Sequence, residues 1–383
     1  MIAMKRILFA SWYSGLGGGE TDLLSLVGTL DAGKYESHLL LPAEGRLAER
    51  WRTQGRHTHI IPYRGASTYF LPAVWARFPA VRRFAELLAR ERIDLVHSDY
   101  HTLPLIAPAA QSLSIPLMWT VHGWWFAPKP WQRVFFRGLR AVARSKAIRD
   151  GFLGKPPFMD AATLPVVYSG VDTKRFHPGL NGMNLRREIG LSEDANVVVM
   201  VGRFQRVKGH HIFQAMAENV LAAMPETQFV IAGDDAFGAR SDQRYRDEIL
   251  ARAESSAVLR ERLRYIGFRQ DIESLYAAAD VVVCPSEFES YGKANLEAMA
   301  CGRPVVSSRH GGPAETVVEG VTGFLVDSGD AEAMAARVMR LLDDAALRKA
   351  MAAAGRQHVE AGFSPEAAAI AYQQIFEELL QLS

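Results

Sequence analysis

Two carboxylates lie on either side of a glycine turn in "PSEFESYGKANLEAMACGRPVV" (285–306), where most other side chains are small or apolar. The preceding "VVVCP" (281–285) predicts a buried strand, and "KANLEAMA" predicts a helix after Gly292. The first backbone N–H groups of such a helix can bind an anion. Glu289 and Glu297 could then accept hydrogen bonds from hydroxyls on either side of a phosphate, a sugar and a ribose. The alternative is that Glu297 pairs with a neighbouring helix and Glu289 is solvated.

A cluster of cations follows another predicted strand in "VGRFQRVKGHH" (201–211). The strand ends at Gly202, and Arg203 and Lys208 come before a predicted helix. A guanidinium can contact two phosphate oxygens at once and an ammonium adds a point charge, so this pattern favours a diphosphate site. The adjacent histidines 210 and 211 would point apart on a helix, which argues against a metal pair.

A glycine-rich loop in "SGLGGGETDLLSL" (14–26) follows the first predicted strand and opens a helix. Gly17 and Gly18 can bring bare backbone N–H groups close to a phosphate or sugar. The loop is not a dinucleotide fingerprint, because Glu20 occupies the position of the third glycine. His122 ends a further strand in "TVHGWWF" (120–126) and would face a ligand cleft, although a structural histidine is the alternative.

Short apolar runs alternate with helical patterns along the whole chain, which predicts parallel, doubly wound sheets. The first series of predicted strands covers 6–11, 37–43, 59–63, 94–99, 116–122 and 164–170, with a helix at 80–92. The second covers 196–202, 227–233, 263–267, 281–285, 304–308 and 323–326. A Gly, Pro and Asn-rich hinge (169–184) separates the two series. We therefore expect an α/β protein with two Rossmann-like domains, residues 1–176 and 177–363, facing a ligand cleft. A C-terminal helix (364–383) is expected to pack on the first domain.

The composition is that of a globular enzyme, with 49% hydrophobic and 22% charged residues among 383. Residues 1–175 hold 23 Lys and Arg against 13 Asp and Glu, whereas residues 176–383 hold 21 against 29. A basic half suggests an anionic partner, and a solubilising surface is the alternative. The two cysteines, Cys284 and Cys301, have no metal spacing and are expected to be buried thiols in a reducing cytoplasm. The N-terminus reads as a first strand and not a signal peptide, and no apolar run is long enough to span a membrane.

A segment rich in aromatic and basic residues, "WWFAPKPWQRVFFRGLRAVARSKAIRDG" (124–151), bears on membrane association. Helically spaced arginines, among them Arg140 and Arg144, beside Trp and Phe suit an interfacial helix on an anionic membrane. The segment "TYFLPAVWARFPAVRRF" (68–84) has a similar character. The alternative is an ordinary helix with aromatic residues in the core and solvated arginines.

These segments together resemble the retaining glycosyltransferases of family 4, which have the GT-B fold. "ESYGKANLEAMACGRPVV" (289–306) is similar to the family's E-x7-E motif, and Gly202-Arg203 with Lys208-Gly209 are similar to its phosphate motif. "SGVDTKRFHP" (169–178) resembles its hinge, with Ser169 in place of the usual Asn. "YIGFRQDIESLYAAADVVVCPS" (265–286) resembles the segment that cradles the nucleotide base.

The resemblance implies roles for particular residues. The residues it assigns to the donor are Gly17, Gly18, Gly202, Arg203, Lys208, Arg269, Glu289, Tyr291, Gly292, Lys293 and Glu297. Those it assigns to catalysis are His122, Arg203, Lys208 and Glu289, with His122 and Trp124 toward the acceptor. Gly123 stands where the family often has Asp. The family works without a metal or other cofactor, and the aspartates of "AGDDAF" (232–237) are adjacent, not alternating as in a DxD metal site.

The expected function is transfer of a hexosyl group, with retention, from a nucleotide-diphosphate sugar to a hydroxyl of a saccharide or lipid-linked acceptor. UDP-sugars are the favoured donors, GDP-mannose comes second, and cell-surface polysaccharide or glycolipid synthesis is the expected setting. A cytoplasmic enzyme, peripheral on an anionic membrane, fits these features, and no nucleic-acid partner is expected. The alternatives are a natural-product glycosyltransferase, a sugar-nucleotide epimerase of the same fold, and a non-catalytic nucleotide-sugar-binding module.

Overall fold

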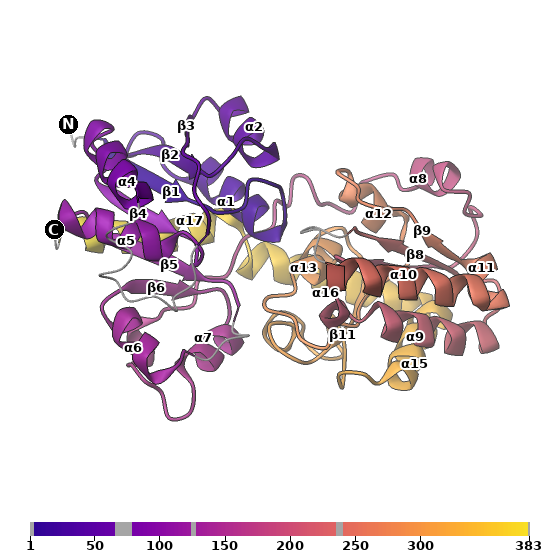
Figure 1. Cartoon of the computed structure of the whole chain (residues 1–383). Coiled ribbons are helices and arrows are strands. Elements are labelled where there is room, and N and C mark those ends of the chain that lie inside the picture. The colour runs from indigo at the N-terminus through magenta and orange to yellow at the C-terminus, as the bar shows by residue number, and fades with distance from the viewer. Residues whose placement is uncertain (1–3, 66–78, 124–127, 235–239, 382–383) are drawn as a thin grey trace. The chain divides into compact units, whose positions relative to one another are not determined.

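The computed structural model describes residues 4–65, 79–123, 128–234 and 240–381 (Figure 1). The chain divides into a first unit, Met1–Gly170 with Pro365–Ser383, and a second unit, Val171–Ser364. The first division falls earlier than the boundary expected after residue 176. The reason is local, because the Val171 N–H donates to the Phe363 carbonyl at 2.9 Å and so ties the hinge to the second unit.

The first unit is built on a six-stranded sheet in the order β3-β2-β1-β4-β5-β6, as far as the described residues show. All of its strand pairs are parallel. Its elements are β1 (Lys5–Ala10), α1 (Gly18–Thr29), β2 (Tyr35–Leu41), α2 (Arg46–Thr53), β3 (His57–Ile60), α4 (Pro79–Arg90), β4 (Leu95–Ser98), α5 (Leu103–Ser112), β5 (Leu117–Val121), α6 (Pro130–Arg137), β6 (Arg140–Ala143), α7 (Lys146–Leu153), the short helix η1 (Ala161–Thr163) and α17 (Pro365–Gln381).

Alternating side chains of this sheet enter two separate apolar cores, one on each face. Leu39 and Leu41 of β2 pack with Phe376 of α17, whereas Leu40 packs with Phe84 of α4. The C-terminal helix therefore completes one face of the first unit, as Figure 1 shows for the yellow ribbon of α17. A sheet covered on both faces leaves its strand ends as the places where polar loops can gather.

The second unit repeats this architecture with a parallel six-stranded sheet, β12-β11-β10-β7-β8-β9, within the residues described. Val198, Val281 and Val306 lie in its core with Phe213 of a covering helix. Its elements are α8 (Met183–Glu188), β7 (Val197–Val201), the short helix η2 (Arg206–Lys208), α9 (His210–Ala223), β8 (Gln228–Ala232), α10 (Arg240–Ser255), α11 (Ala257–Arg262), β9 (Leu263–Tyr265), α12 (Ile272–Ala278), β10 (Val281–Cys284), α13 (Lys293–Ala300), β11 (Val305–Ser308), α14 (Pro313–Thr316), β12 (Gly323–Val326), α15 (Ala331–Asp343) and α16 (Ala345–Gly362).

The predicted α/β class with two parallel sheets is confirmed, and all six strands predicted for the second series are present. Cys284 and Cys301 are buried thiols, as expected. The prediction for 164–170 is wrong, because this stretch makes only an isolated bridge between Val166 and Ala143. The sixth strand of the first sheet is β6 instead.

The continuous basic helix predicted within 124–151 is also wrong, because the chain there forms α6, β6 and α7. Gly138 ends α6, and the Ser145 hydroxyl caps α7 by accepting from the Ile148 N–H. Between the end of α6 and the cap of α7, the four residues of β6 (Arg140–Ala143) pair with β5. Residues 66–78, which hold most of the second basic segment, lie outside the described residues.

Candidate active site

The loops that follow β7 and β10 lie next to each other, because these strands are neighbours in the second sheet. Gly202 and Arg203 follow β7, and the loop ends in η2 and Gly209. The backbone N–H of Glu287, after β10, donates to the Val207 carbonyl at 2.8 Å. The two segments that the sequence singled out separately therefore form one surface at the carboxyl ends of adjacent strands.

Lys208 and Glu289 are joined directly in this surface. The Lys208 Nζ lies 2.6 Å from the Glu289 Oε2, and their side chains are only 21% and 16% exposed. The Ser286 hydroxyl donates to the same oxygen at 3.3 Å. Burial by itself would raise the pKa of Glu289, but Lys208, the hydrogen bonds and the charge of Arg203 outweigh it, so that the pKa lies below its ordinary value. Glu289 is therefore ionised at neutral pH.

Backbone contacts fix the position of Glu289. Its N–H donates to the His310 carbonyl at 3.2 Å, and its carbonyl accepts from the Gly312 N–H at 2.8 Å. A Cβ at Gly311, whose φ is +94°, would lie 2.1 Å from the Glu289 carbonyl oxygen. Only glycine allows this close approach of the two loops. The carboxylate is thus held by backbone geometry on both sides.

Arg203 and Gly202 complete the segment after β7. The Arg203 side chain is half-buried, and its charge acts on the Glu289 carboxylate as described above. A Cβ at Gly202 would make only ordinary contact with Lys208, at 3.7 Å. The fold therefore does not itself require glycine at 202. Three predicted site residues, Arg203, Lys208 and Glu289, thus act on one another.

The turn into α13 matches the geometry expected from its glycine. Gly292 has a φ of +82° and precedes Lys293, the first residue of the helix. Glu297 lies one turn further, where its Oε2 accepts from the Tyr276 hydroxyl at 3.0 Å and its Oε1 lies 3.8 Å from the Lys293 Nζ. Burial outweighs these partners and raises the pKa of Glu297 above its ordinary value. The two carboxylates of the motif thus differ, with Glu289 the stronger acid.

Two other predicted donor residues have partners within the second unit. Arg269 donates to Glu188 at 2.7 Å and to Asp271 at 2.9 Å, and these hydrogen bonds raise its pKa far above the usual range. Its charge is therefore already balanced by two carboxylates. Tyr291 is buried, at 4% exposure, and its ring centroid lies 6.5 Å from that of Phe363.

The glycine-rich loop and His122 come together in the first unit. Gly17 precedes α1, and its N–H donates to the Glu20 carboxylate at 3.0 Å. A Cβ at Gly18 would meet nothing within 4 Å, and one at Gly19 would lie 3.8 Å from the His122 ring. The loop after β1 therefore lies beside the histidine that follows β5.

Arg144 holds the His122 ring, and the sequence reasoning missed this role. Its guanidinium donates to the His122 Nδ1 at 3.1 Å and also contacts Asp22 and Ser169. Because a guanidinium only donates, Nδ1 must be the unprotonated nitrogen, and Nε2 carries the hydrogen. Burial lowers the pKa of His122 to about 4, so the ring is neutral at physiological pH. The spacing of Arg144 had suggested a membrane-facing position, whereas its side chain is 9% exposed.

Two earlier predictions, for Trp124 and Arg140, remain to be placed. Trp124 lies outside the described residues, and so does Asp235 of the "AGDDAF" segment. Arg140, predicted on an interfacial helix, lies on β6 and donates to Glu378 of α17 at 2.7 Å. Among the helices that the structure describes, none combines the length and apolar character needed to cross a bilayer.

Comparison with known families divides the chain in two. Residues 16–175 match the profile of "Glycosyltransferase Family 4", and residues 183–358 match that of "Glycosyl transferases group 1". The matched ranges leave out only the ends of the chain and the hinge. Each range corresponds to one of the two sheets.

Individual relatives agree with these profiles. The D-inositol 3-phosphate glycosyltransferase of Segniliparus rotundus is 32% identical over 329 residues, which are 80% of this chain and 71% of that protein. The enzyme of the same name from Corynebacterium urealyticum is 36% identical over 203 residues, so that the aligned part spans 51% of this chain and about half, 47%, of that relative. The crystal structure of Anabaena Alr3699/HepE with UDP and glucose superposes with a TM-score of 0.80 at 24% identity, covering 98% of this chain and 99% of that one.

Two Rossmann-like units in one chain are the architecture of the GT-B fold. The chain belongs to the group 1 glycosyltransferases, family 4. The predicted family, fold and transferase class are confirmed.

Proposed function

We propose that this transferase moves a hexosyl group, with retention, from a nucleotide-diphosphate sugar to a hydroxyl acceptor, with UDP-sugars the favoured donors and GDP-mannose second. The observation that carries the proposal is the buried pair of Lys208 and Glu289, with Arg203 acting on the same carboxylate. A diphosphate brings negative charge to the two cations. A sugar brings hydroxyls that an ionised carboxylate can accept.

The chemistry follows from where charge develops. In the reaction the bond from the sugar anomeric carbon to the phosphate oxygen breaks, and its electron pair leaves with the nucleoside diphosphate. The acceptor oxygen bonds to the anomeric carbon, and its proton leaves with the diphosphate. Arg203 and Lys208 would stabilise the diphosphate charge as it grows. Glu289 would hold the donor sugar, and Glu297 would accept from the ribose hydroxyls.

The first unit would orient the reacting groups. The Gly17 N–H donates to Glu20, so the Gly18 N–H is the one we assign to the donor. The same loop reaches His122 through Gly19, and the neutral ring of His122 donates from Nε2. A neutral donor of this kind can orient a sugar or acceptor hydroxyl without adding charge. Metal ions and other cofactors have no part in this proposal, because the two cations supply the charge that a divalent ion supplies elsewhere.

The relatives guide the choice of substrates. A protein with the same fold was crystallised with UDP, which supports UDP as the nucleotide part of the donor. The name of the D-inositol 3-phosphate glycosyltransferases adds an inositol phosphate to the saccharide and lipid-linked acceptors already considered. The excess of Lys and Arg in residues 1–175 suits anionic acceptors of either kind. Cell-surface polysaccharide or glycolipid synthesis is the setting we favour.

A peripheral position on the cytoplasmic face of a membrane is the second part of the proposal. It no longer rests on a long basic helix, but on α6, where Trp131 is 44% and Val134 is 72% exposed. Exposed aromatic and apolar side chains on a basic unit are typical of interfacial contact.

The proposal is tested by nucleoside-diphosphate release from UDP-, GDP-, ADP- and dTDP-sugars, with EDTA and without acceptor, and then with saccharide, lipid-linked and inositol phosphate acceptors. Release from one donor, faster with an acceptor, is the expected result. Conversion of the donor sugar to an isomer without diphosphate release would indicate an epimerase instead. Binding without turnover under all of these conditions would indicate a non-catalytic module.

A further inference from the structure

A group of histidines and one glutamate lies at the edge of the first sheet, away from the candidate active site. Glu36 and His38 alternate on β2 and so point to one face, and His57 is the β3 partner of His38 in the strand register. Glu36 and His57 are near the amino-terminal ends of their strands, and His38 is in the middle of β2. The glycine loop and His122, in contrast, follow the carboxyl ends of β1 and β5.

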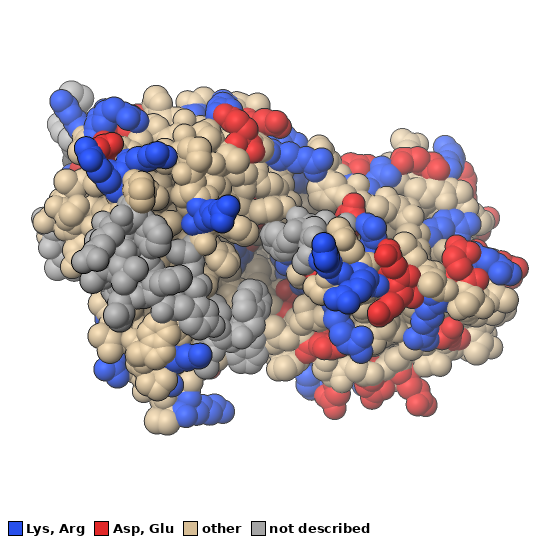
Figure 2. Space-filling model, viewed as in Figure 1, with Lys and Arg blue, Asp and Glu red and all other residues tan. Residues whose placement is uncertain are grey.

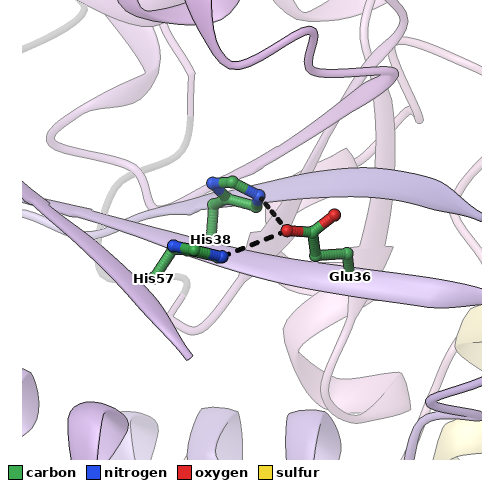
Figure 3. Close-up of side chains that lie close together, drawn as sticks. All are labelled: Glu36, His38 and His57. Atoms are coloured by element: carbon green, nitrogen blue, oxygen red, sulfur yellow. Dashed lines mark ion pairs between the residues drawn. The ribbon is translucent and has the colours of Figure 1, made fainter. Parts of the chain in front are cut away.

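The ligand atoms of these three side chains have the spacing of a metal site (Figure 3). The Glu36 Oε1 lies 3.3 Å from the His38 Nε2 and 3.2 Å from the His57 Nε2. All three atoms lie within 4.8 Å of one another. Tetrahedral zinc, with bonds of about 2.0–2.1 Å, separates its ligand atoms by roughly 3.3 Å. Two of the three spacings therefore already match.

The buried His38 supplies a second, independent observation. Its side chain is 2% exposed, and its Nε2 makes no hydrogen bond of regular geometry, although it lies 3.3 Å from the Glu36 Oε1. Buried polar atoms are nearly always hydrogen-bonded, so a nitrogen left in this state points to a missing partner. A cation between the carboxylate and the two rings would satisfy it.

Outer contacts orient the same groups. The His38 Nδ1 lies 3.1 Å from the His59 Nε2, and the Arg6 Nε donates to the second oxygen of Glu36 at 3.0 Å. Hydrogen bonds of this kind fix the tautomer and direction of metal ligands. An overlapping group of His38, His59 and Glu91 shares His38 with this one.

We propose that Glu36, His38 and His57 bind a zinc-type divalent cation, whose fourth position is filled by water. One carboxylate with two imidazoles is a ligand set that zinc prefers. His57, at 61% exposure, leaves the site open for entry of the ion. The bound ion would join the edge strand β3 to β2 and stabilise the first unit. This site is independent of the glycosyl transfer proposed above.

The test is calorimetric titration of the metal-stripped full chain with Zn²⁺ alone. The wild type is expected to bind one equivalent, and His57→Ala, at an exposed position that the fold tolerates, to bind at least about tenfold more weakly. Glu36→Gln should weaken binding in the same way. His101→Ala removes an exposed histidine of the same unit outside the cluster and should bind as the wild type does.

Two further measurements distinguish specific binding at Glu36, His38 and His57 from nonspecific binding to surface histidines. Zn²⁺ should raise the melting temperature of the wild type and not that of His57→Ala, because only specific binding to the folded state stabilises it. Bound Co²⁺ should give the visible spectrum of a tetrahedral ion. Absence of binding in the wild type, or equal binding in the wild type and His57→Ala, would overturn the proposal and leave Glu36 in plain ion pairs with the histidines.

Discussion

Lys208 and Glu289 set the charge of the candidate donor site. An ammonium and a carboxylate 2.6 Å apart, both mostly shielded from water, attract each other far more strongly than an exposed pair would. Removing one of them leaves the other buried without its counter-charge. A ligand that brings both anionic and hydroxyl oxygens can interact with each member of the pair.

Replacement of Lys208 by Ala is expected to raise the barrier of glycosyl transfer by about 2–4 kcal/mol, a rate loss of about 30- to 1,000-fold. The reason is the loss of a cation placed to meet the departing diphosphate. Turnover at saturating donor, measured as diphosphate release, checks this. Lys349→Ala removes an exposed lysine of α16 in the same unit and should leave turnover unchanged. Near-normal turnover in Lys208→Ala would contradict the assigned role.

The buried ring of His122 makes the free energy of unfolding depend on pH in the acid range. Its pKa lies at about 4 in the folded chain, lowered by burial from the ordinary value of 6.5. The unfolded chain therefore binds the proton first, and the stability that depends on the neutral ring is present above pH 6.5 and lost as the pH falls toward 4.

His122→Gln, which cannot be protonated, is expected to lose less unfolding free energy than the wild type between about pH 7 and about pH 4.5. Urea denaturation at both pH values measures the difference. His101→Gln, at an exposed histidine, should show the wild-type loss. An equal loss in His122→Gln and the wild type would show that the ring is not held neutral.

At the scale of elements, the turn from η2 into α9 places Lys208 beside Glu289. Gly209 has a φ of +75°, and a Cβ there would lie 2.1 Å from the Pro285 carbonyl oxygen. Gly190 has a similar φ of +69° with nothing within 4 Å, which makes it a matched control.

We expect Gly190→Ala to cost about 1–2 kcal/mol of unfolding free energy, from the left-handed backbone alone. Gly209→Ala should cost more, because the added clash pushes the loops after β7 and β10 apart. Chemical denaturation of both variants compares the two costs. Equal costs would mean that the loops adjust freely.

Strand positions were readable from the sequence where apolar runs are long and bounded, as in 196–202 and 281–285. β6 was missed because its four residues lie within an aromatic and basic run that also fits a helix. Which strands are neighbours is not encoded locally. The pairing that brings Lys208 to Glu289 was therefore not predicted; the family resemblance only assigned both residues to the donor site.

Side-chain partners were the least predictable feature of the sites. Arg144 reaches Asp22 and His122 across the first sheet, and nothing in the local sequence around 144 indicates this. The residues of the proposed metal site stand at alternating positions, Glu36 and His38 in "ESHLLL" and His57 with His59 in "RHTHI". Their meeting depends on the register of β2 with β3, which only the structure provides.

At the scale of the whole molecule, charge is divided between the two units. On the face drawn in Figure 2, Lys and Arg predominate on the first unit, while Asp and Glu are more numerous on the second. The counts over residues 1–175 and 176–383 have the same signs. Under the membrane proposal, a basic unit with exposed apolar residues on α6 would concentrate near anionic surfaces, and salt would weaken the attraction.

The double variant Trp131→Ser with Val134→Ser is expected to lose affinity for vesicles that contain anionic lipid, because α6 would no longer bury apolar area at the interface. Co-sedimentation at low and high salt measures this. Val258→Ser removes an exposed valine of the second unit and should bind as the wild type does. Wild-type binding that is absent, or equal for neutral and anionic vesicles, would contradict the membrane proposal.

In the proposed function, the loops after β7 and β10 hold the diphosphate of a nucleotide sugar. Calorimetric titration of UDP into the wild type and Lys208→Ala, in the presence of EDTA, measures this directly. The wild type should bind UDP without a metal, and loss of one charged contact should weaken binding by about 10–100-fold. Equal affinities for the wild type and Lys208→Ala would contradict the placement of the donor, and binding that requires a divalent ion would contradict its metal-independent character.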